Sequence, residues 1–117
     1  MPLDERLLAV RLKNHIKELK VWERIMINLY ILGGFDEPIK LVTVMNACYN
    51  GELTPNRRRS LYGTIYRSIE KLKTDGNVIR YNNPVRYQLA RNKHTAINLA
   101  GISRKLGFPN ARTEDFL

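Results

Sequence analysis

Side chains along the first thirty residues form a mostly apolar stripe at alternating spacings of four and three. The positions are Leu8, Leu12, His15, Leu19, Trp22, Met26 and Leu29. A stripe of about three heptads predicts a helix from Asp4 to about Leu32, stopped by Gly33 and Gly34. Beyond Trp22 the segment is apolar on nearly all sides, so its second half is expected to be buried. The pattern leaves open whether the helix breaks near Lys20.

A second, shorter helix is expected in the segment "LVTVMNACYN", ended by Asn50 and Gly51. The connector before it, "FDEPIK", contains Pro38, which biases the preceding residue away from helix and permits a short extended piece at Ile39. Cys48 is the only cysteine, so the chain has no internal disulfide, and we expect it to be a small buried side chain.

The third predicted helix has signals at both ends. Thr54 is a good N-cap, Pro55 suits the first helical position, and Asp75 and Gly76 follow the last residue, Thr74. At about 100° per residue, one arc of this helix is apolar and should face the core. The apolar arc consists of Leu61, Ile65, Ile69 and Leu72, and the opposite arc of Asn56, Arg59, Ser60, Gly63 and Arg67.

After Gly76 the apolar period changes from that of a helix to that of a strand. The segment "NVIRYNNPVRYQL" predicts a hairpin over residues 77–90 with its turn at Asn82, Asn83 and Pro84. On the first strand Ile79 and Tyr81 share a face, and on the second Val85, Tyr87 and Leu89 do. We expect Arg80 and Arg86 to leave the core face together.

The C-terminal segment predicts one weaker helix and a tail. In "HTAINLAGISRKLGF" the apolar residues Ile97, Ala100 and Leu106 fall on one side. The last nine residues, "PNARTEDFL", are expected to be a loose terminus.

Positive charge is concentrated in the middle of the chain. The net charge is +9, and 117 residues are enough for one domain with a single core. Lys and Arg balance Asp and Glu at seven each over residues 1–54, but number nine against two over residues 55–91. Arg57, Arg58 and Arg59 stand where a helix N-terminus favours anions. Such a localised excess is typical of a surface that binds a polyanion.

The order of helix, helix, basic helix and hairpin, together with "IEKLKTDGNVIRYNNPVRYQL", resembles the winged helix-turn-helix family. The residues that carry the resemblance are a leucine, three polar residues and a glycine at the helix end, and a Tyr-x-Leu pattern on the returning strand. The chain departs from the family where Asn77 stands between Gly76 and the apolar pair Val78-Ile79, which puts the strand register in question by one residue.

The resemblance implies a mainly α fold with a small β-hairpin (α+β). Residues 21–91 would form the winged helix-turn-helix domain, and residues 92–117 a C-terminal helix and tail. The heptad stripe, not the resemblance, makes residues 1–20 the expected dimerisation helix, with the C-terminal helix as an alternative or second contributor. Helix 55–74 would enter the major groove of duplex DNA, and hairpin 77–90 would be the wing.

Candidate contact residues follow from the two arcs, the hairpin and the resemblance. On the helix they are Asn56, Arg57, Arg58, Arg59, Ser60, Gly63 and Arg67. On the wing they are Arg80, Asn82, Asn83 and Arg86. The expected dimer interface is Leu8, Leu12, His15, Leu19 and Trp22. Arg59 suits guanine and Asn56 adenine, whereas Gly63 indicates either a close approach of DNA or simple tolerance.

These patterns predict a sequence-specific DNA-binding protein, most simply a transcriptional regulator acting as a homodimer in the cytoplasm. Two alternatives stay open: a protein-interaction module of the same fold, and an RNA-binding protein. No catalytic set, phosphate loop or apolar span for a membrane is evident, and the two histidines are far apart in sequence. We therefore expect no enzyme activity, no metal, no cofactor and no membrane partner.

Overall fold

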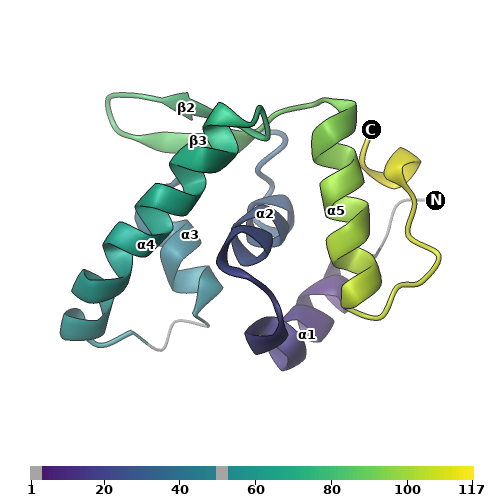
Figure 1. Ribbon diagram of the computed structural model, residues 1–117, viewed down its shortest axis with the longest axis horizontal. Coiled ribbons are helices and arrows are strands. Elements are labelled where there is room, and N and C mark those ends of the chain that lie inside the picture. The colour runs from purple at the N-terminus through teal and green to yellow at the C-terminus, as the bar shows by residue number, and fades with distance from the viewer. Residues whose placement is uncertain (1–3, 50–52) are drawn as a thin grey trace.

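The computed structural model describes residues 4–49 and 53–117 of the chain. Within them the fold is mainly helical with a small three-stranded antiparallel sheet (Figure 1), in agreement with the α+β class expected from the sequence. The elements are α1 (Glu5–His15), the 3₁₀ turn η1 (Ile16–Glu18), α2 (Val21–Ile31), β1 (Ile39–Lys40), α3 (Leu41–Cys48), α4 (Pro55–Thr74), β2 (Val78–Tyr81), β3 (Arg86–Leu89), α5 (Lys93–Lys105) and the 3₁₀ turn η2 (Thr113–Phe116).

The helix α4 begins and ends where its sequence signals predict. The backbone N–H of Arg57 donates to Oγ1 of Thr54 at 3.2 Å, and Pro55 occupies the first helical position. Gly76, with φ of 85°, takes the left-handed conformation that ends the helix. The predicted end of α3 at Asn50 and Gly51 lies outside the described residues.

The N-terminal stripe forms two helices instead of one. The chain breaks after His15 through η1, and Lys20 precedes α2, where its backbone N–H donates to Oε1 of Glu23 at 2.9 Å. The break folds α1 back, and Leu8, Leu12 and Leu19 are buried in the core of their own chain. The sequence prediction that these leucines form a dimer interface is therefore wrong, because they have no exposed surface to offer.

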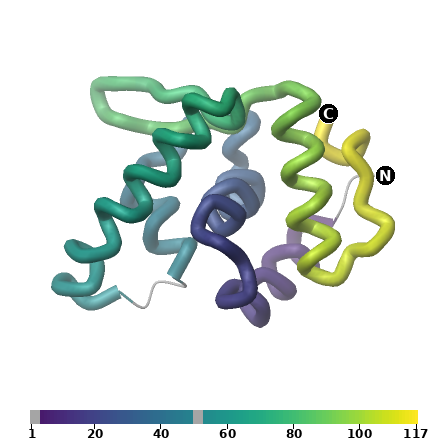
Figure 2. Tube along the Cα trace, viewed as in Figure 1, coloured from purple at the N-terminus to yellow at the C-terminus, as the bar shows by residue number. Residues whose placement is uncertain are grey.

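One hydrophobic core includes side chains from all three predicted segments of the chain. The helix α2 lies at the centre, with α4 on one side and α5 on the other (Figures 1 and 2). The C-terminal tail joins this core, since Phe116 is buried. Its ring packs edge-on against the ring of Tyr30, with 5.0 Å between the ring centroids. The tail is thus packed, not loose as expected, while Ile97 faces solvent.

The sheet has the strand order β1-β3-β2, so the hairpin of β2 and β3 gains a third strand from the connector before α3. Ile39 pairs with Tyr87, which confirms the extended piece at Ile39. Val78 pairs with Leu89 and Arg80 with Tyr87, and the inward side chains of β2 are Val78 and Arg80.

The face of β2 is the reverse of the predicted one. Ile79 and Tyr81 are exposed, because Asn77 is drawn into the junction between α4 and β2. Its N–H donates to the carbonyl of Leu72 at 2.8 Å, and its carbonyl accepts from Ala90 at 2.9 Å. The first inward side chain of the strand is therefore Val78, one residue before the predicted Ile79. Because side chains alternate along a strand, each following side chain lies on the face opposite to the predicted one.

The hairpin tip and the N-terminal half of α4 project to the same side of the molecule, away from α5 (Figure 1). The C-terminus lies on the opposite side, next to α5 (Figure 2). None of the helices in the described ranges combines the length and the apolarity that crossing a bilayer requires.

We predict that Phe116→Ala lowers the free energy of unfolding by about 3 kcal/mol, because it empties a site in the core. Denaturant unfolding followed by circular dichroism measures the change. The matched control is Leu117→Ala, which removes the neighbouring, largely exposed side chain and should change stability by less than about 0.5 kcal/mol. Equal effects of the two substitutions would contradict a packed tail.

Candidate nucleic-acid interface

The first turn and a half of α4 extends beyond the body of the protein. All six residues from Pro55 to Ser60 are exposed, whereas Ile65, Ile69 and Leu72 further along the helix are buried. The predicted core arc is thus confirmed, with Leu61 partly buried at its start. Asn56, Arg59, Ser60 and Arg67 of the polar arc are exposed, as predicted.

The arginines at this end of α4 lack acidic partners within the described residues. The first turn holds no Asp or Glu. None of the five ion pairs among the described residues includes Arg57, Arg58, Arg59 or Arg67. Cations near a helix N-terminus are unfavourable by about 0.3–1 kcal/mol each at low ionic strength. An external anion at this position would relieve that cost.

Gly63 has a specific neighbour on the exposed side of α4. A Cβ built at this position would lie 3.1 Å from a terminal guanidinium nitrogen of Arg67. The Arg67 side chain therefore folds back along the helix over the glycine, and an alanine would push it a few tenths of an ångström away. Gly63 thus gives the Arg67 guanidinium a place close to the helix backbone.

The Glu70 carboxylate joins the hairpin to α4. Its Oε2 accepts a hydrogen bond from the Tyr87 hydroxyl at 2.7 Å, and its Oε1 lies 3.3 Å from both Lys73 Nζ and an Arg80 guanidinium nitrogen. The same Arg80 nitrogen donates to the Tyr66 hydroxyl at 3.3 Å. We call Glu70, Tyr66, Arg80 and Tyr87 the hairpin anchor.

Charges and hydrogen bonds in the hairpin anchor shift two pKa values in opposite directions. Partial burial acts to raise the pKa of Glu70, but hydrogen bonds from Tyr87 and Lys73 and the charges of Lys73 and Arg80 outweigh it, so the pKa is lowered from 4.5. Burial, followed by the bond to the Glu70 carboxylate, raises the pKa of the Tyr87 hydroxyl. Glu70 is therefore held as the anion and Tyr87 as the neutral donor.

The structure separates the two arginines predicted for the wing. Arg80 pairs with Tyr87 on the inward face, so the expectation that it points outward with Arg86 is wrong. Arg86 pairs with Tyr81 on the other face, and its Nε donates to the Pro84 carbonyl at 3.4 Å.

At the hairpin tip, Asn82 and Asn83 are exposed, and Asn82 Oδ1 accepts from Arg80 Nε at 3.1 Å. The hairpin keeps its polar tip, but Arg80 serves as an anchor.

The remaining residues of the predicted dimer interface have other roles. His15 is half-exposed and lies 3.4 Å from Glu18, its neighbour on the 3₁₀ turn. Trp22 is partly buried and lines a pocket between α2, α4 and α5. The five predicted residues therefore do not form one exposed surface.

Sequence reasoning missed an apolar groove beside the basic helix end. It lies between α3 and α4, has a volume of about 450 Å³, and is lined by Val42, Met45, Pro55 and Tyr62 with Arg58 and Arg59. Val42 and Tyr62 are both more than two-fifths exposed. The exposed Tyr62 ring stacks on that of Tyr66 at 6.3 Å. The sequence signal for this groove is weak: at about 100° per residue Tyr62 falls at the edge of the apolar arc of the helix, next to Leu61.

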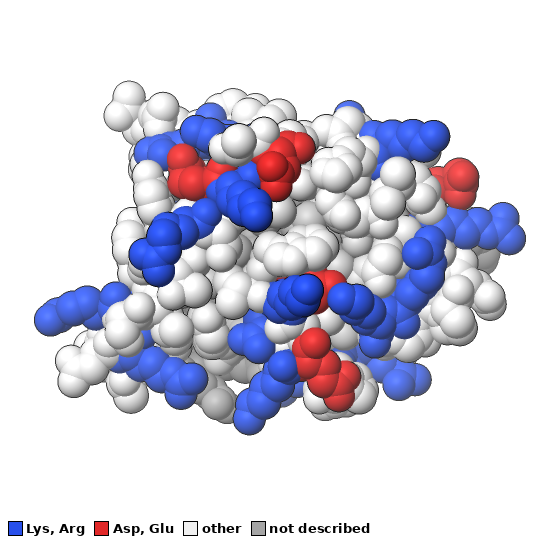
Figure 3. All heavy atoms as spheres, in the orientation of Figure 1, with Lys and Arg blue, Asp and Glu red and all other residues white. Residues whose placement is uncertain are grey.

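Basic side chains are spread over the visible face more widely than their distribution along the chain suggests. Figure 3 shows Lys and Arg at the α4 end and also over the α5 end, with acidic side chains among them in the upper part, at the right and below the centre. The α4 end differs from the rest of this face in having three consecutive exposed arginines, Arg57, Arg58 and Arg59. At the end of α5, by contrast, Lys105 Nζ pairs with the carboxylate of the buried Glu23 at 2.6 Å.

Other kinds of site receive little support from the described residues. Burial raises the pKa of the Cys48 thiol to about 12, so it is not a ready nucleophile. Across residues 4–49 and 53–117, no three His, Cys, Asp or Glu side chains gather where they could hold a metal ion. Comparison with protein-family models, curated proteins and solved structures found no match to this chain.

We predict that Glu70→Gln destabilises the protein by about 1–2 kcal/mol at neutral pH, because the charged hydrogen bonds of the hairpin anchor are weakened. The folded-state pKa of Glu70 lies below its unfolded value, so this contribution is complete above the unfolded pKa. It is lost as the pH falls through the folded-state pKa. Denaturant unfolding of both proteins across acidic pH should therefore show the difference shrinking toward zero.

The control for this series is Glu37→Gln, which removes an exposed carboxylate with no ion pair among the described residues. It should change stability little at any pH in the series. A Glu70 effect that stays constant from neutral pH to below its folded-state pKa would contradict the anionic role of Glu70.

Proposed function

We propose that the protein is a winged helix-turn-helix protein that binds double-stranded DNA and acts as a transcriptional regulator. The observation that carries the proposal is the exposed end of α4 with its consecutive arginines, beside a hairpin that is tied to the same helix. An isolated basic helix end would suit any anion. A basic helix next to an anchored hairpin suits the groove and backbone of a duplex.

The order of the elements supports the fold assignment in this proposal. From α2 onward the chain runs helix, strand, helix, helix, strand, strand, and the single strand β1 completes the sheet beside β3. In this arrangement α3 and α4 are the helix-turn-helix pair, and the hairpin of β2 and β3 is the wing. Fold alone does not give function, so the basic surface carries the rest of the argument.

In the proposed complex the N-terminal half of α4 enters the major groove. A helix fits this groove, and its first residues reach the base edges. Asn56 and Arg59 on the exposed arc are suited to adenine and guanine, respectively. Arg57 and Arg58 flank them and would contact phosphates. Arg67, held over Gly63, would meet the backbone further along the helix.

The wing contributes in a different way from the one the sequence suggested. Arg80 is engaged with Glu70 and Tyr66, so it fixes the angle between hairpin and helix. The exposed tip residues Asn82 and Asn83, with Arg86 on the outer face, are then the groups available to the DNA backbone. We propose that the wing adds contacts that do not depend on base sequence.

The homodimer stays a prediction and needs a surface other than the buried leucines. The exposed apolar side chains of α1, Leu7 and Val10, are available for such a surface. A two-fold dimer would recognise a nearly palindromic site with half-sites separated by about one helical turn, ~10 base pairs, or a multiple. Sedimentation of the protein alone reports its oligomeric state.

We predict that duplex affinity falls steeply with salt, by about 10³-fold between 50 and 200 mM if about six phosphates are neutralised. Fluorescence anisotropy with a labelled duplex measures this. Arg58→Ala should weaken binding and reduce the salt slope by about one. The control Arg112→Ala removes an exposed arginine next to η2, outside the proposed DNA surface, and should leave both unchanged. A flat salt response would exclude the mechanism.

We predict that Arg59→Ala relaxes base preference at one position of the site, because a bidentate contact to guanine discriminates by about 1–3 kcal/mol. Selection of bound duplexes from a random pool, with wild type and variant, measures the change. Arg86→Ala is the comparison, since a backbone contact should weaken binding to all sequences alike. An unchanged preference in the Arg59 variant would place the readout elsewhere.

The apolar groove between α3 and α4 favours one second candidate, a protein-interaction module. Apolar side chains flanked by Arg58 and Arg59 would accept an acidic amphipathic segment of another protein. Val42→Asn separates the two functions, because a neutral polar side chain would weaken docking in the apolar groove without adding a charge beside Arg58 and Arg59. Two results together would favour this candidate. The Val42 variant would lose a protein partner that wild type binds, and wild type would show no measurable binding to duplex DNA.

A further inference from the structure

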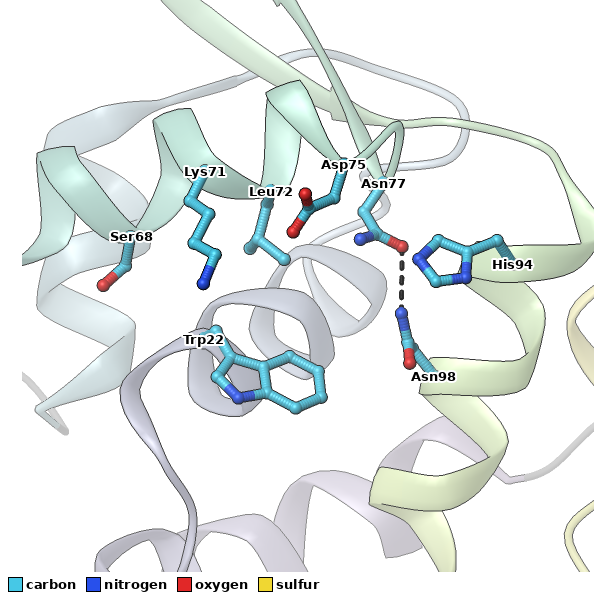
Figure 4. Close-up of a pocket in the computed structure, with 8 residues that line it drawn as sticks. All are labelled: Trp22, Ser68, Lys71, Leu72, Asp75, Asn77, His94 and Asn98. Atoms are coloured by element: carbon cyan, nitrogen blue, oxygen red, sulfur yellow. Dashed lines mark hydrogen bonds between the residues drawn. The ribbon is translucent and has the colours of Figure 1, made fainter.

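A second pocket lies at the other end of α4, away from the exposed arginines. It has a volume of about 460 Å³ and is formed where the C-terminal half of α4 faces α2 and the start of α5 (Figure 4). Its lining includes Trp22 from α2, Lys71, Leu72 and Asp75 from the end of α4, Asn77 just beyond it, and Asn98 from α5. Since the proposed DNA surface does not include this pocket, its role is a separate question.

Two opposite charges line one wall of this pocket. Lys71 and Asp75 are four residues apart, which places them one above the other at the end of α4, with Cβ atoms about 5–6 Å apart. Neither takes part in an ion pair within the described part of the chain. Both side chains are drawn at the pocket in Figure 4, with Lys71 directed toward Trp22. The wall therefore presents a cation and an anion that are not neutralised by each other.

The floor of the pocket is apolar. Figure 4 shows the Trp22 indole lying below Leu72 and Lys71, with one side of the ring toward the pocket. Trp22 is only partly buried, although it is the single tryptophan of the chain and packs against the hydrophobic core. Its ring gives an apolar side chain a flat surface to lie against, beside the charged wall.

The far wall is held rigid by amides. The buried Asn77 accepts a hydrogen bond at Oδ1 from Asn98 Nδ2 at 3.1 Å, and a second at 3.4 Å from the Thr95 hydroxyl. These bonds fix α5 against the end of α4 and leave Oδ1 of Asn98 as an acceptor at the pocket. The pocket is thus bounded by elements that are tied together without a ligand.

We propose that this pocket binds a free α-amino acid with an apolar or aromatic side chain. The ligand carboxylate would pair with the Lys71 ammonium, and the ligand ammonium with the Asp75 carboxylate. Its side chain would lie against Trp22 and Leu72. The class is chosen because an α-amino acid carries an ammonium and a carboxylate on the same carbon, so one end of the ligand can meet two opposite protein charges one helical turn apart. A ligand with one charge would leave the other protein charge without a partner.

Trp22 makes the test direct, because the single tryptophan reports on its own pocket. Its fluorescence is titrated with L-phenylalanine and with two analogues, 3-phenylpropanoate, which lacks the amino group, and 2-phenylethylamine, which lacks the carboxylate. We expect a saturable change with L-phenylalanine and binding about tenfold weaker for each analogue, since each loses one charged hydrogen-bonding contact. The experiment needs no DNA, so it is independent of the proposed function.

Two variants assign the effect to the charged wall. Lys71→Met and Asp75→Asn alter exposed side chains and should each weaken binding of L-phenylalanine about tenfold. Lys17→Met and Glu37→Gln make the same changes of charge at exposed positions outside the pocket lining and should leave binding unchanged. A shift of the Asn98 side-chain amide resonance on addition of L-phenylalanine gives a second readout.

The proposal is overturned by any of three results. The first is no saturable change of Trp22 fluorescence and no shift of the Asn98 resonance with L-phenylalanine. The second is equal binding of L-phenylalanine and both analogues, which would indicate apolar contact alone. The third is equal affinity in wild type and in both pocket variants, which would place the ligand elsewhere.

Discussion

A single carboxylate, that of Glu70, holds the hairpin against the long basic helix. It receives the hydroxyl of Tyr87, whose side chain is fully buried, and it lies beside the guanidinium of Arg80. A carboxylate that is partly withdrawn from water keeps its charge only when hydrogen bonds and cations compensate for the lost hydration. Here Tyr87, Lys73 and Arg80 provide that compensation, and the position of the hairpin relative to α4 follows from it.

The same interaction sorts the basic residues of this region into two groups. Arg80 and Lys73 are partnered by Glu70, so they belong to the structure of the protein. The arginines at the start of α4 have no such partner among the described residues and stand on a part of the helix where every residue is exposed. Glu70 therefore offsets positive charge near the hairpin, whereas the positive charge at the N-terminus of α4 is not offset. The partial positive charge of the helix N-terminus makes that position unfavourable for cations. This contrast is the physical basis of the proposed DNA surface.

A second constraint comes from the N-terminal leucines. A chain of this length needs most of its apolar side chains for one core, and the break after His15 lets α1 contribute to it. The heptad pattern does mark buried side chains, but these side chains pack against the rest of the same chain and not against a second copy. The C-terminal Phe116 covers another part of the core next to Tyr30. With these elements in place, α5 packs against α2 and encloses the pocket that contains Trp22.

The sequence determined those features that depend on neighbours along the chain. The cap at Thr54, the proline after it and the glycine at position 76 gave the bounds of α4, and the apolar period of the helix gave its buried arc. The exposed arc of candidate contact residues followed from the same period. Such signals are local, because a cap or a helical face involves residues only a few positions apart.

Only the tertiary structure decided which of two possible partners each side chain takes. The face of β2 depended on Asn77 bonding across to Leu72 and Ala90, and this placed Arg80 on Glu70. The burial of Leu8 depended on the chain turning back, and the grouping of Trp22 with Lys71 and Asp75 depended on the packing of α2 against α4. These contacts join residues far apart in sequence. A periodic apolar pattern predicts that a helix face is buried, but it does not say whether the face is buried in the core of the same chain or against another chain.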